Sequence, residues 1–201
     1  MLAKLNSTIE QVLKIPIPDN RKVILDKFKD YIQNKLEIGE TPRLNFICTH
    51  NSRRSQFSQI WAQTAAAFFA IDVECFSGGV ELTAFNERAV ASILRCGFKV
   101  EKEGEINPKY SVYYDTKSKP IVAFSKLFDD TPSPFAAVMT CAHADENCPF
   151  IPAAECRIPV RYDDPKAFDD TALEAEKYDE RSIQIASEMF YVFRNLANKK
   201  L

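Results

Sequence analysis

Apolar residues along this chain fall into two patterns, short runs typical of strands and longer stripes at helical spacing. Short runs occupy residues 44–47, 73–77, 135–140 and 157–161, of which 73–77 alternates like a strand, and a helical stripe follows the first, the second and the last of them. Strands that alternate with helices favour a parallel sheet, because each connection must cross back over the sheet. We therefore predict an α/β fold with helices on both faces of a parallel sheet.

Two segments depart from this alternation. Residues 1–40 carry two apolar stripes at helical spacing, separated by a pair of prolines and ended by a glycine. We expect two helices that extend the core, with an arm for homodimerisation or partner binding as the alternative. Near residues 107–130, two strand-like runs flank a polar turn and predict an inserted β-hairpin, whose aromatic residues form a packing face rather than the mouth of a site. Residues 41–201 then make up the domain that carries the sheet.

The segment richest in chemistry is Cys48-Thr-His-Asn-Ser-Arg-Arg54-Ser55. A hydrophobic strand precedes it and good helix formers follow, so it should form a tight loop between strand and helix. Backbone N–H groups between Cys48 and Arg54 can converge on one point at the helix N-terminus, as in an anion cradle. The helix dipole and Arg54 favour the Cys48 thiolate, and the guanidinium can clamp an oxyanion through two parallel hydrogen bonds. The predicted chemistry is nucleophilic attack by sulfur on a tetrahedral oxyanion.

This loop resembles the phosphate-binding loop of the low-molecular-weight protein tyrosine phosphatase superfamily, which includes the thioredoxin-coupled arsenate reductases. The resemblance runs from about Leu44 to the C-terminus and implies a three-layer fold with a four-stranded parallel sheet. It also implies that Cys48 is the nucleophile and that Ser55 and Asn51 hold the thiolate and the loop. The residues that the resemblance implies for oxyanion binding are Thr49, His50, Asn51, Ser52, Arg53 and Arg54.

A second motif, Cys141-Ala-His-Ala-Asp-Glu-Asn-Cys148-Pro, resembles the redox segment of the arsenate reductases in its spacing, its Ala-Asp-x-Asn interior and its proline. The resemblance implies a thiol relay: Cys141 attacks Cys48 to release arsenite, and Cys148 captures Cys141 in a disulfide that a thioredoxin-like reductant opens. The alternative is that both are structural thiols. We interpret the other cysteines as small hydrophobic residues, namely Cys75, Cys96 and Cys156.

Asp164 and Pro165 resemble the general-acid loop of the superfamily, so Asp164 should protonate the leaving oxygen. Asp163 is the alternative donor. Lys166 stands where the tyrosine phosphatases usually have an aromatic residue for the substrate ring. This substitution favours a small inorganic oxyanion over an aryl phosphate, although Phe168 is near.

Three positions depart from the pattern of the superfamily. His50 replaces a glycine, so we expect a positive φ there. Arg53 brings an extra guanidinium, which either strengthens anion capture or points to solvent. Gln59 stands where potassium-binding reductases have an acid, and a potassium site with Asn51 and Ser77 is therefore doubtful. No metal and no other cofactor is predicted.

The composition excludes several classes of protein. A net charge of −2 over 201 residues gives no attraction to nucleic acid or to anionic membranes. No apolar run approaches the roughly 20 residues that span a bilayer, and the first residues lack the apolar core of a signal peptide. We expect a cytoplasmic protein whose six cysteines are thiols rather than structural disulfides.

Three functions are compatible with these motifs. The first is a thioredoxin-coupled arsenate reductase that uses Cys48, Cys141 and Cys148. The second is a low-molecular-weight protein tyrosine phosphatase, in which Cys48 and Asp164 keep their roles and the other cysteines protect Cys48 from oxidation. The third is an oxyanion-binding protein without turnover, whose N-terminal helices contact a partner.

Overall fold

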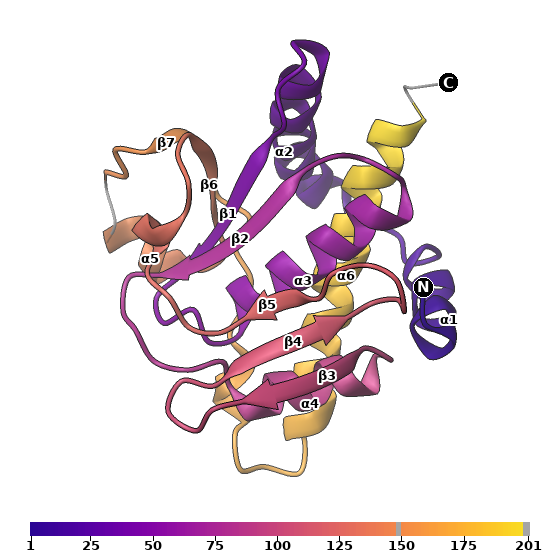
Figure 1. The fold of residues 1–201 in the computed structure, drawn as a ribbon, viewed down its shortest axis with the longest axis vertical. Coiled ribbons are helices and arrows are strands. Elements are labelled where there is room, and N and C mark those ends of the chain that lie inside the picture. The colour runs from indigo at the N-terminus through magenta and orange to yellow at the C-terminus, as the bar shows by residue number, and fades with distance from the viewer. Residues whose placement is uncertain (148–149, 199–201) are drawn as a thin grey trace.

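A four-stranded parallel sheet forms the centre of the fold, seen in a computed structural model that describes residues 1–147 and 150–198 (Figure 1). Its strands are β1 (Arg43–Cys48), β2 (Glu74–Gly79), β6 (Phe135–Met139) and β7 (Ala154–Ile158). They lie in the order β2-β1-β6-β7, and neighbouring strands are parallel. The predicted parallel sheet is confirmed.

Helices cover both faces of this sheet. On one face lie α3 (Arg54–Phe68) and α6 (Glu174–Ala197), and Phe46 of β1 belongs to the large core beneath them. On the other face Ile47 joins a smaller buried cluster with α5 (Ala142–Asn147). Successive residues of a strand point to opposite faces, so a strand covered on both sides must be apolar almost throughout. The continuous apolar runs in the sequence have this origin.

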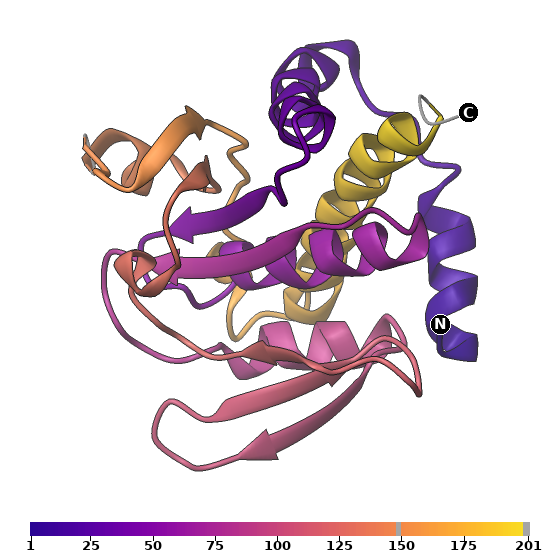
Figure 2. The same cartoon turned by 45° about the horizontal axis from the view of Figure 1, so that its top comes forward.

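The N-terminal helices are α1 (Ala3–Val12) and α2 (Asp19–Glu37), and both pack against α6 (Figure 2). Their apolar stripes lie in the same core as α3 and α6. The fully or almost fully buried residues are Leu5, Ile9, Val12, Leu25, Phe28 and Ile32. The two helices therefore extend the core, as predicted from their spacing, whereas homodimerisation through them stays a prediction.

A second sheet is antiparallel and contains β3 (Lys99–Glu103), β4 (Lys109–Tyr113) and β5 (Ile121–Ala123), in that order. The predicted hairpin is the β4–β5 pair. β3 was not predicted, because four of its five residues are charged and mostly exposed. Tyr110 is buried and its ring packs edge-on against Phe85, with 5.5 Å between the centroids. Tyr110 of β4 is thus an aromatic residue that packs into the core, as expected.

The helix α4 (Glu87–Arg95) packs beside the second sheet (Figure 2). It begins at Asn86, whose side chain accepts hydrogen bonds from the N–H groups of Arg88 and Ala89. It ends at Gly97, where φ is 102°. An asparagine cap at the start and a glycine in the left-handed region at the end satisfy the unpaired groups of the helix termini.

The last strand of the central sheet ends earlier than predicted. β7 stops at Ile158, whereas the apolar run predicted a strand over residues 157–161. Pro159 has no N–H for a ladder hydrogen bond, so pairing ends before it.

Two 3-10 turns, η1 (Phe128–Asp130) and η2 (Pro165–Phe168), lie on the loops after β5 and β7. Within the described residues, no helix is long and apolar enough to cross a bilayer.

Candidate active site

The loop between Cys48 and Arg54 lies at the carboxyl end of β1, in the middle of the sheet. The connection after β1 leads to β2 on one side, and the connection after β6 leads to β7 on the other. Open parallel sheets bind ligands at such a switch point, outside the carboxyl ends of the strands. Cys141 follows the end of β6, so the topology brings it to the same edge of the sheet as Cys48.

Two groups of the loop meet the sulfur of Cys48. The N–H of Asn51 donates to Sγ at 3.2 Å, and Oγ of Ser55 lies 3.0 Å from it. Asn51 Nδ2 donates to the same serine oxygen at 2.9 Å, which leaves the serine hydrogen to point at sulfur. Two donors then converge on one sulfur, as an anionic nucleophile requires.

Asn51, and not His50, has the left-handed backbone conformation of the loop, with φ at 47°. The prediction of a positive φ at His50 is therefore wrong. The backbone N–H of Lys126 donates to Asn51 Oδ1 at 3.0 Å, which fixes the orientation of the carboxamide, and Gln56 Nε2 donates to the same oxygen at 3.1 Å. Asparagine tolerates positive φ better than most residues. In this conformation its N–H, Nδ2 and Oδ1 all hold the loop.

The carbonyl groups of the loop point away from Cys48 Sγ, toward donors in the surrounding chain. The hydrogen-bonded carbonyls are those of Cys48, Thr49, His50, Asn51 and Ser52. In contrast, four amides of the loop have no acceptor in the part of the chain that the structure describes. These are the N–H groups of Thr49, His50, Ser52 and Arg53. Occupied carbonyls and available amides are the properties of an anion cradle.

Two glycines of β2 allow the close approach of the loop. A Cβ on Gly79 would lie 2.8 Å from the backbone nitrogen of Asn51, nearer than real Cβ contacts. A Cβ on Gly78 would lie 2.3 Å from Cα of Phe128, so this residue admits η1 instead. Gly79 is therefore the glycine of β2 against which the loop packs.

Asp164 lies between two arginines at the other side of the loop. Its carboxylate accepts hydrogen bonds from Arg53 Nε at 2.8 Å, from Arg53 Nη2 at 3.2 Å and from Arg54 Nη2 at 2.7 Å. Burial raises the pKa of Asp164, but the hydrogen bonds and charges of the two arginines outweigh it, so the pKa lies below its usual value. Arg53 does not point to solvent, one of its two predicted orientations, since only 9% of it is exposed.

Asp163, the alternative donor, lies outside this cluster. Its side chain is 96% exposed, and its nearest cation, Arg181 Nη2, is 3.5 Å away. Asp164 is therefore the acid that belongs to the loop. Its Oδ1 also accepts from the N–H of Lys166, which caps η2 and fixes the carboxylate on that turn.

Cys141 is buried, and it shares a cluster of buried residues with Cys48. Its sulfur lies 3.6 Å from Thr49 Oγ1 and accepts from the N–H of Ala144 at 3.3 Å. His143 Nδ1 lies 3.2 Å from the same threonine hydroxyl. The second cysteine therefore contacts the nucleophile loop through a side chain of that loop. Cys148, the third predicted redox cysteine, lies outside the described residues.

Comparisons with known proteins agree with this geometry. No protein-family model matches the chain. The arsenate reductase of Staphylococcus aureus strain Newman is 28% identical over 120 residues, which are 60% of this chain and 76% of that protein. The arsenate reductase of Halalkalibacterium halodurans is 25% identical over 120 residues, 60% of this chain and 71% of that protein.

A solved structure shares the fold of this chain. A low-molecular-weight phosphotyrosine phosphatase from Vibrio cholerae O395 aligns over 98% of its length and 79% of this chain, with a TM-score of 0.53 and 14% identity. The chain has the fold of the low-molecular-weight phosphotyrosine phosphatases. The shared fold thus spans nearly the whole phosphatase, while part of this chain has no counterpart in it.

The structure also shows residues of the candidate site that the sequence did not predict. Gln56 Nε2 donates to the carbonyl groups of Asn51 and Phe124, so it ties the loop to the second sheet. Lys126 reaches the loop through its backbone N–H, and Tyr162 accepts a hydrogen bond from Arg54 Nη1 at 2.9 Å on its carbonyl. No local sequence signal distinguishes these residues, because their role depends on contacts between distant segments.

The residues considered for potassium form a hydrogen-bonded network among themselves. Ser77 Oγ donates to Gln59 Oε1 at 2.6 Å, and both acceptor sites of the Asn51 carboxamide oxygen are used by N–H donors. The ammonium of Lys126 lies 3.2 Å from Ser77 Oγ. Burial lowers the pKa of Lys126 to about 8, although the charge of Asp130 opposes this effect. A cationic side chain thus already lies among these oxygens.

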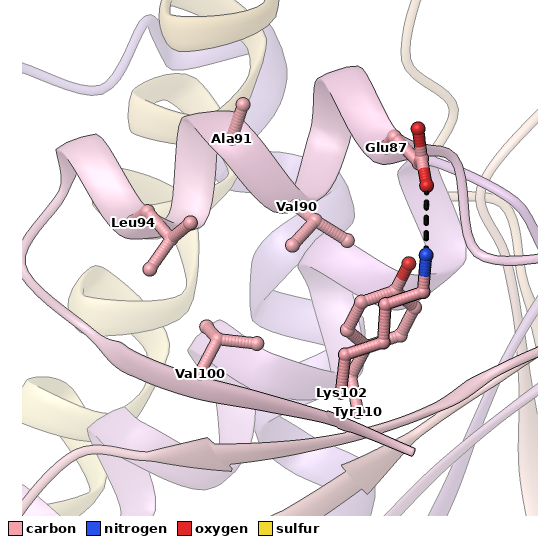
Figure 3. A pocket seen from close by; sticks show the side chains of 7 residues that line it. All are labelled: Glu87, Val90, Ala91, Leu94, Val100, Lys102 and Tyr110. Carbon is pink, nitrogen blue, oxygen red and sulfur yellow. Dashed lines mark hydrogen bonds and ion pairs between the residues drawn. The ribbon is translucent and has the colours of Figure 1, made fainter. Parts of the chain in front are cut away.

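A separate pocket of about 270 Å³ lies between α4 and the second sheet (Figure 3). Its lining residues are Glu87, Val90, Ala91, Leu94, Val100, Lys102 and Tyr110. Lys102 and Glu87 form an ion pair across its mouth, with 3.0 Å between Nζ and Oε1. None of the lining residues belongs to the loop, to Asp164 or to Cys141, so this pocket is separate from the candidate active site.

Proposed function

We propose that this protein is an arsenate reductase in which Cys48, Cys141 and Cys148 pass a disulfide from the oxyanion site to the surface. The single observation that carries the proposal is the position of Cys141, buried beside the nucleophile loop with its sulfur 3.6 Å from Thr49 Oγ1. A phosphatase needs no second thiol there. The arsenate reductases of Staphylococcus aureus and Halalkalibacterium halodurans support the same choice.

In the first step the Cys48 thiolate attacks arsenic, and a sulfur–arsenic bond replaces a bond from arsenic to oxygen. The amides of the loop and Arg54 hold the remaining oxygens. Asp164 gives its proton to the departing hydroxide, which leaves as water. Arg54 must turn from Asp164 to the oxyanion, and this movement, with the anion's own charge, raises the pKa of Asp164 in the complex.

In the second step the Cys141 thiolate attacks the Cys48 sulfur. The sulfur–sulfur bond forms as the sulfur–arsenic bond breaks, and its electron pair reduces arsenic from the +5 to the +3 state, so that arsenite leaves. The Thr49 hydroxyl and the His143 imidazole lie in line to take the proton of the Cys141 thiol. Cys148 then attacks Cys141, which restores the Cys48 thiolate.

The third step needs a dithiol of the thioredoxin class to open the Cys141–Cys148 disulfide. A reducing compartment such as the cytoplasm keeps all three residues as thiols between turnovers. Steady-state assays with arsenate, thioredoxin and its reductase test the proposal. Turnover that depends on both arsenate and thioredoxin supports it, whereas hydrolysis of an aryl phosphate with no arsenate turnover favours a phosphatase.

A protein tyrosine phosphatase is the second candidate, and the same loop supports it. In that reaction Cys48 takes the phosphoryl group, Asp164 protonates the leaving alkoxide, and water completes the cycle. Lys166, on the turn after Asp164, offers no aromatic face for a substrate ring. We therefore expect aryl phosphate hydrolysis as a side activity that does not require thioredoxin.

Replacing Arg53 should shift the pH dependence of the reaction. Arg53 holds the pKa of Asp164 down through its hydrogen bonds and its charge, so Arg53→Met raises that pKa. A step that needs protonated Asp164 is lost as pH rises through this pKa. We expect the limb of the kcat profile that falls with rising pH to lie at higher pH in the variant than in the wild type. Arg88→Met is the control, since Arg88 pairs with Glu174 and Asp170 instead; equal profiles for wild type and Arg53→Met would contradict the assignment.

We also propose that the loop works without potassium, because Lys126 supplies the cation beside Ser77. The wild-type protein should turn over at the same rate in sodium chloride and in potassium chloride of equal ionic strength. Lys126→Met should lower the affinity for the oxyanion, since the Ser77 and Gln59 network loses its cation. Deprotonation has the same effect, so wild-type affinity should fall as pH rises through about 8. Rates of the wild type that rise with potassium would contradict the proposal.

A further inference from the structure

The N-terminal helix α2 reaches the residues that hold the acid loop, through Arg21 in its first turn. The Arg21 guanidinium donates to Glu188 through Nε at 2.8 Å and through Nη2 at 2.6 Å. Glu188, on α6, is only 2% exposed and accepts a third hydrogen bond from the Tyr162 hydroxyl at 2.8 Å. The guanidinium also lies over the Tyr162 ring, 5.1 Å from its centroid. Arg21 thus contacts the face of the Tyr162 ring, and Glu188 binds its hydroxyl.

Tyr162 connects this cluster to the active site. Its carbonyl accepts from Arg54 Nη1 at 2.9 Å, and its N–H donates to the carbonyl of Thr140 at 3.1 Å. Asp164, which binds Arg54 Nη2, follows two residues later. The segment from Tyr162 to Asp164 therefore sets the direction of the Arg54 guanidinium. The side chain of Tyr162 is in turn held by Arg21 of α2 and Glu188 of α6.

We propose that Arg21, Glu188 and Tyr162 are positioning residues, by which the N-terminal segment fixes Arg54 and Asp164 for the oxyanion. A purely stabilising role explains the cluster less well. Burying the Glu188 carboxylate and most of the Arg21 guanidinium costs desolvation, and apolar residues of similar volume often stabilise a core as well or better. The inference rests on the proposed function for the roles of Arg54 and Asp164 in the reaction. The affinity of the loop for an oxyanion tests the inference without any need for turnover.

Two changes separate position from stability. Tyr162→Phe removes the hydroxyl and leaves the ring and the backbone carbonyl in place. The double variant Arg21→Met with Glu188→Leu replaces the ion pair by apolar residues, which avoids an unpaired buried charge. Arg95→Met with Asp179→Leu is the matched control, because Arg95 also binds a carboxylate of α6 by two hydrogen bonds, at 2.7 and 2.8 Å.

Four quantities are measured for each variant: the Tm, the affinity of its Cys48→Ser form for inorganic phosphate, kcat and KM. We expect about tenfold losses in kcat and in phosphate affinity for the Arg21 and Glu188 double variant, since small misplacements of a clamp cost this much or more. Tyr162→Phe should show a smaller loss of the same kind. The control pair should keep the phosphate affinity and kcat of the parent protein. Across the variants, the losses in kcat and phosphate affinity should not follow the decrease in Tm.

Unchanged kcat and phosphate affinity in the Arg21 and Glu188 double variant would overturn the inference. So would losses that match those of the control pair or that follow the Tm. A parent protein that binds phosphate but turns over neither arsenate nor an aryl phosphate would overturn the proposed function alone, because the phosphate affinities would still compare the variants.

Discussion

Cys48→Ser should lower both arsenate reduction and aryl phosphate hydrolysis by about 10⁴-fold or more, because no other group can form the covalent intermediate. A serine hydroxyl in this position has the hydrogen-bond partners of the thiol, Asn51 N–H and Ser55 Oγ. It lacks the nucleophilicity of a thiolate, however, and an alkoxide is far less accessible at neutral pH. The variant should still bind phosphate, since the loop amides and Arg54 are unchanged.

Cys156→Ser is the matched control for this loss. Cys156 is half-buried in β7, where burial raises the pKa of its thiol to about 11, so it is a poor nucleophile at neutral pH. We expect it to keep the activity of the wild type in both assays. Activity of Cys48→Ser within about tenfold of the wild type would remove Cys48 from the role of nucleophile.

Cys141→Ser should abolish arsenate turnover and leave aryl phosphate hydrolysis almost unchanged. The variant can form the Cys48 adduct but lacks the thiol that lies beside the loop and attacks it, so arsenite is not released. Phosphate ester hydrolysis uses water in its second step and does not need this thiol. The measurement compares arsenite release and aryl phosphate hydrolysis in the same preparation, where the ratio of the two activities cancels errors in the active fraction.

Two results would separate the alternatives for Cys141. Arsenite release from Cys141→Ser at the rate of the wild type would exclude the relay and make Cys141 a structural thiol. Loss of both activities would instead show that the substitution disturbs the loop through Thr49, whose hydroxyl meets the Cys141 sulfur. Thr49→Ser, which keeps the hydroxyl, should then behave like the wild type.

The sequence predicted the elements that depend on local patterns. The continuous apolar run before Cys48 is the central strand β1, and the helix formers after Ser55 are α3. The family resemblance led to Cys141, whose sulfur lies 3.6 Å from Thr49 Oγ1 in the structure. The predictions of the strand and of the helix succeeded because both are encoded by consecutive residues.

Other features of the site depend on contacts that no local pattern reports. The cation next to Ser77 comes from Lys126, and the support of Tyr162 comes from Arg21, which is 167 positions from its partner Glu188. The left-handed residue of the loop was assigned to His50 by analogy, but Asn51 alone can combine that conformation with hydrogen bonds to the loop and to Lys126. Backbone strain and long-range ion pairs are decided by tertiary structure.

The most direct test is a single turnover of the fully reduced protein with one equivalent of arsenate, followed by mass mapping of its disulfides. The proposed relay predicts one arsenite released per protein and a disulfide between Cys141 and Cys148, with Cys48 again a thiol. In Cys148→Ser the same reaction should stop with Cys48 bonded to Cys141. All thiols still reduced, in a sample that hydrolyses an aryl phosphate, would contradict the reductase and leave the phosphatase.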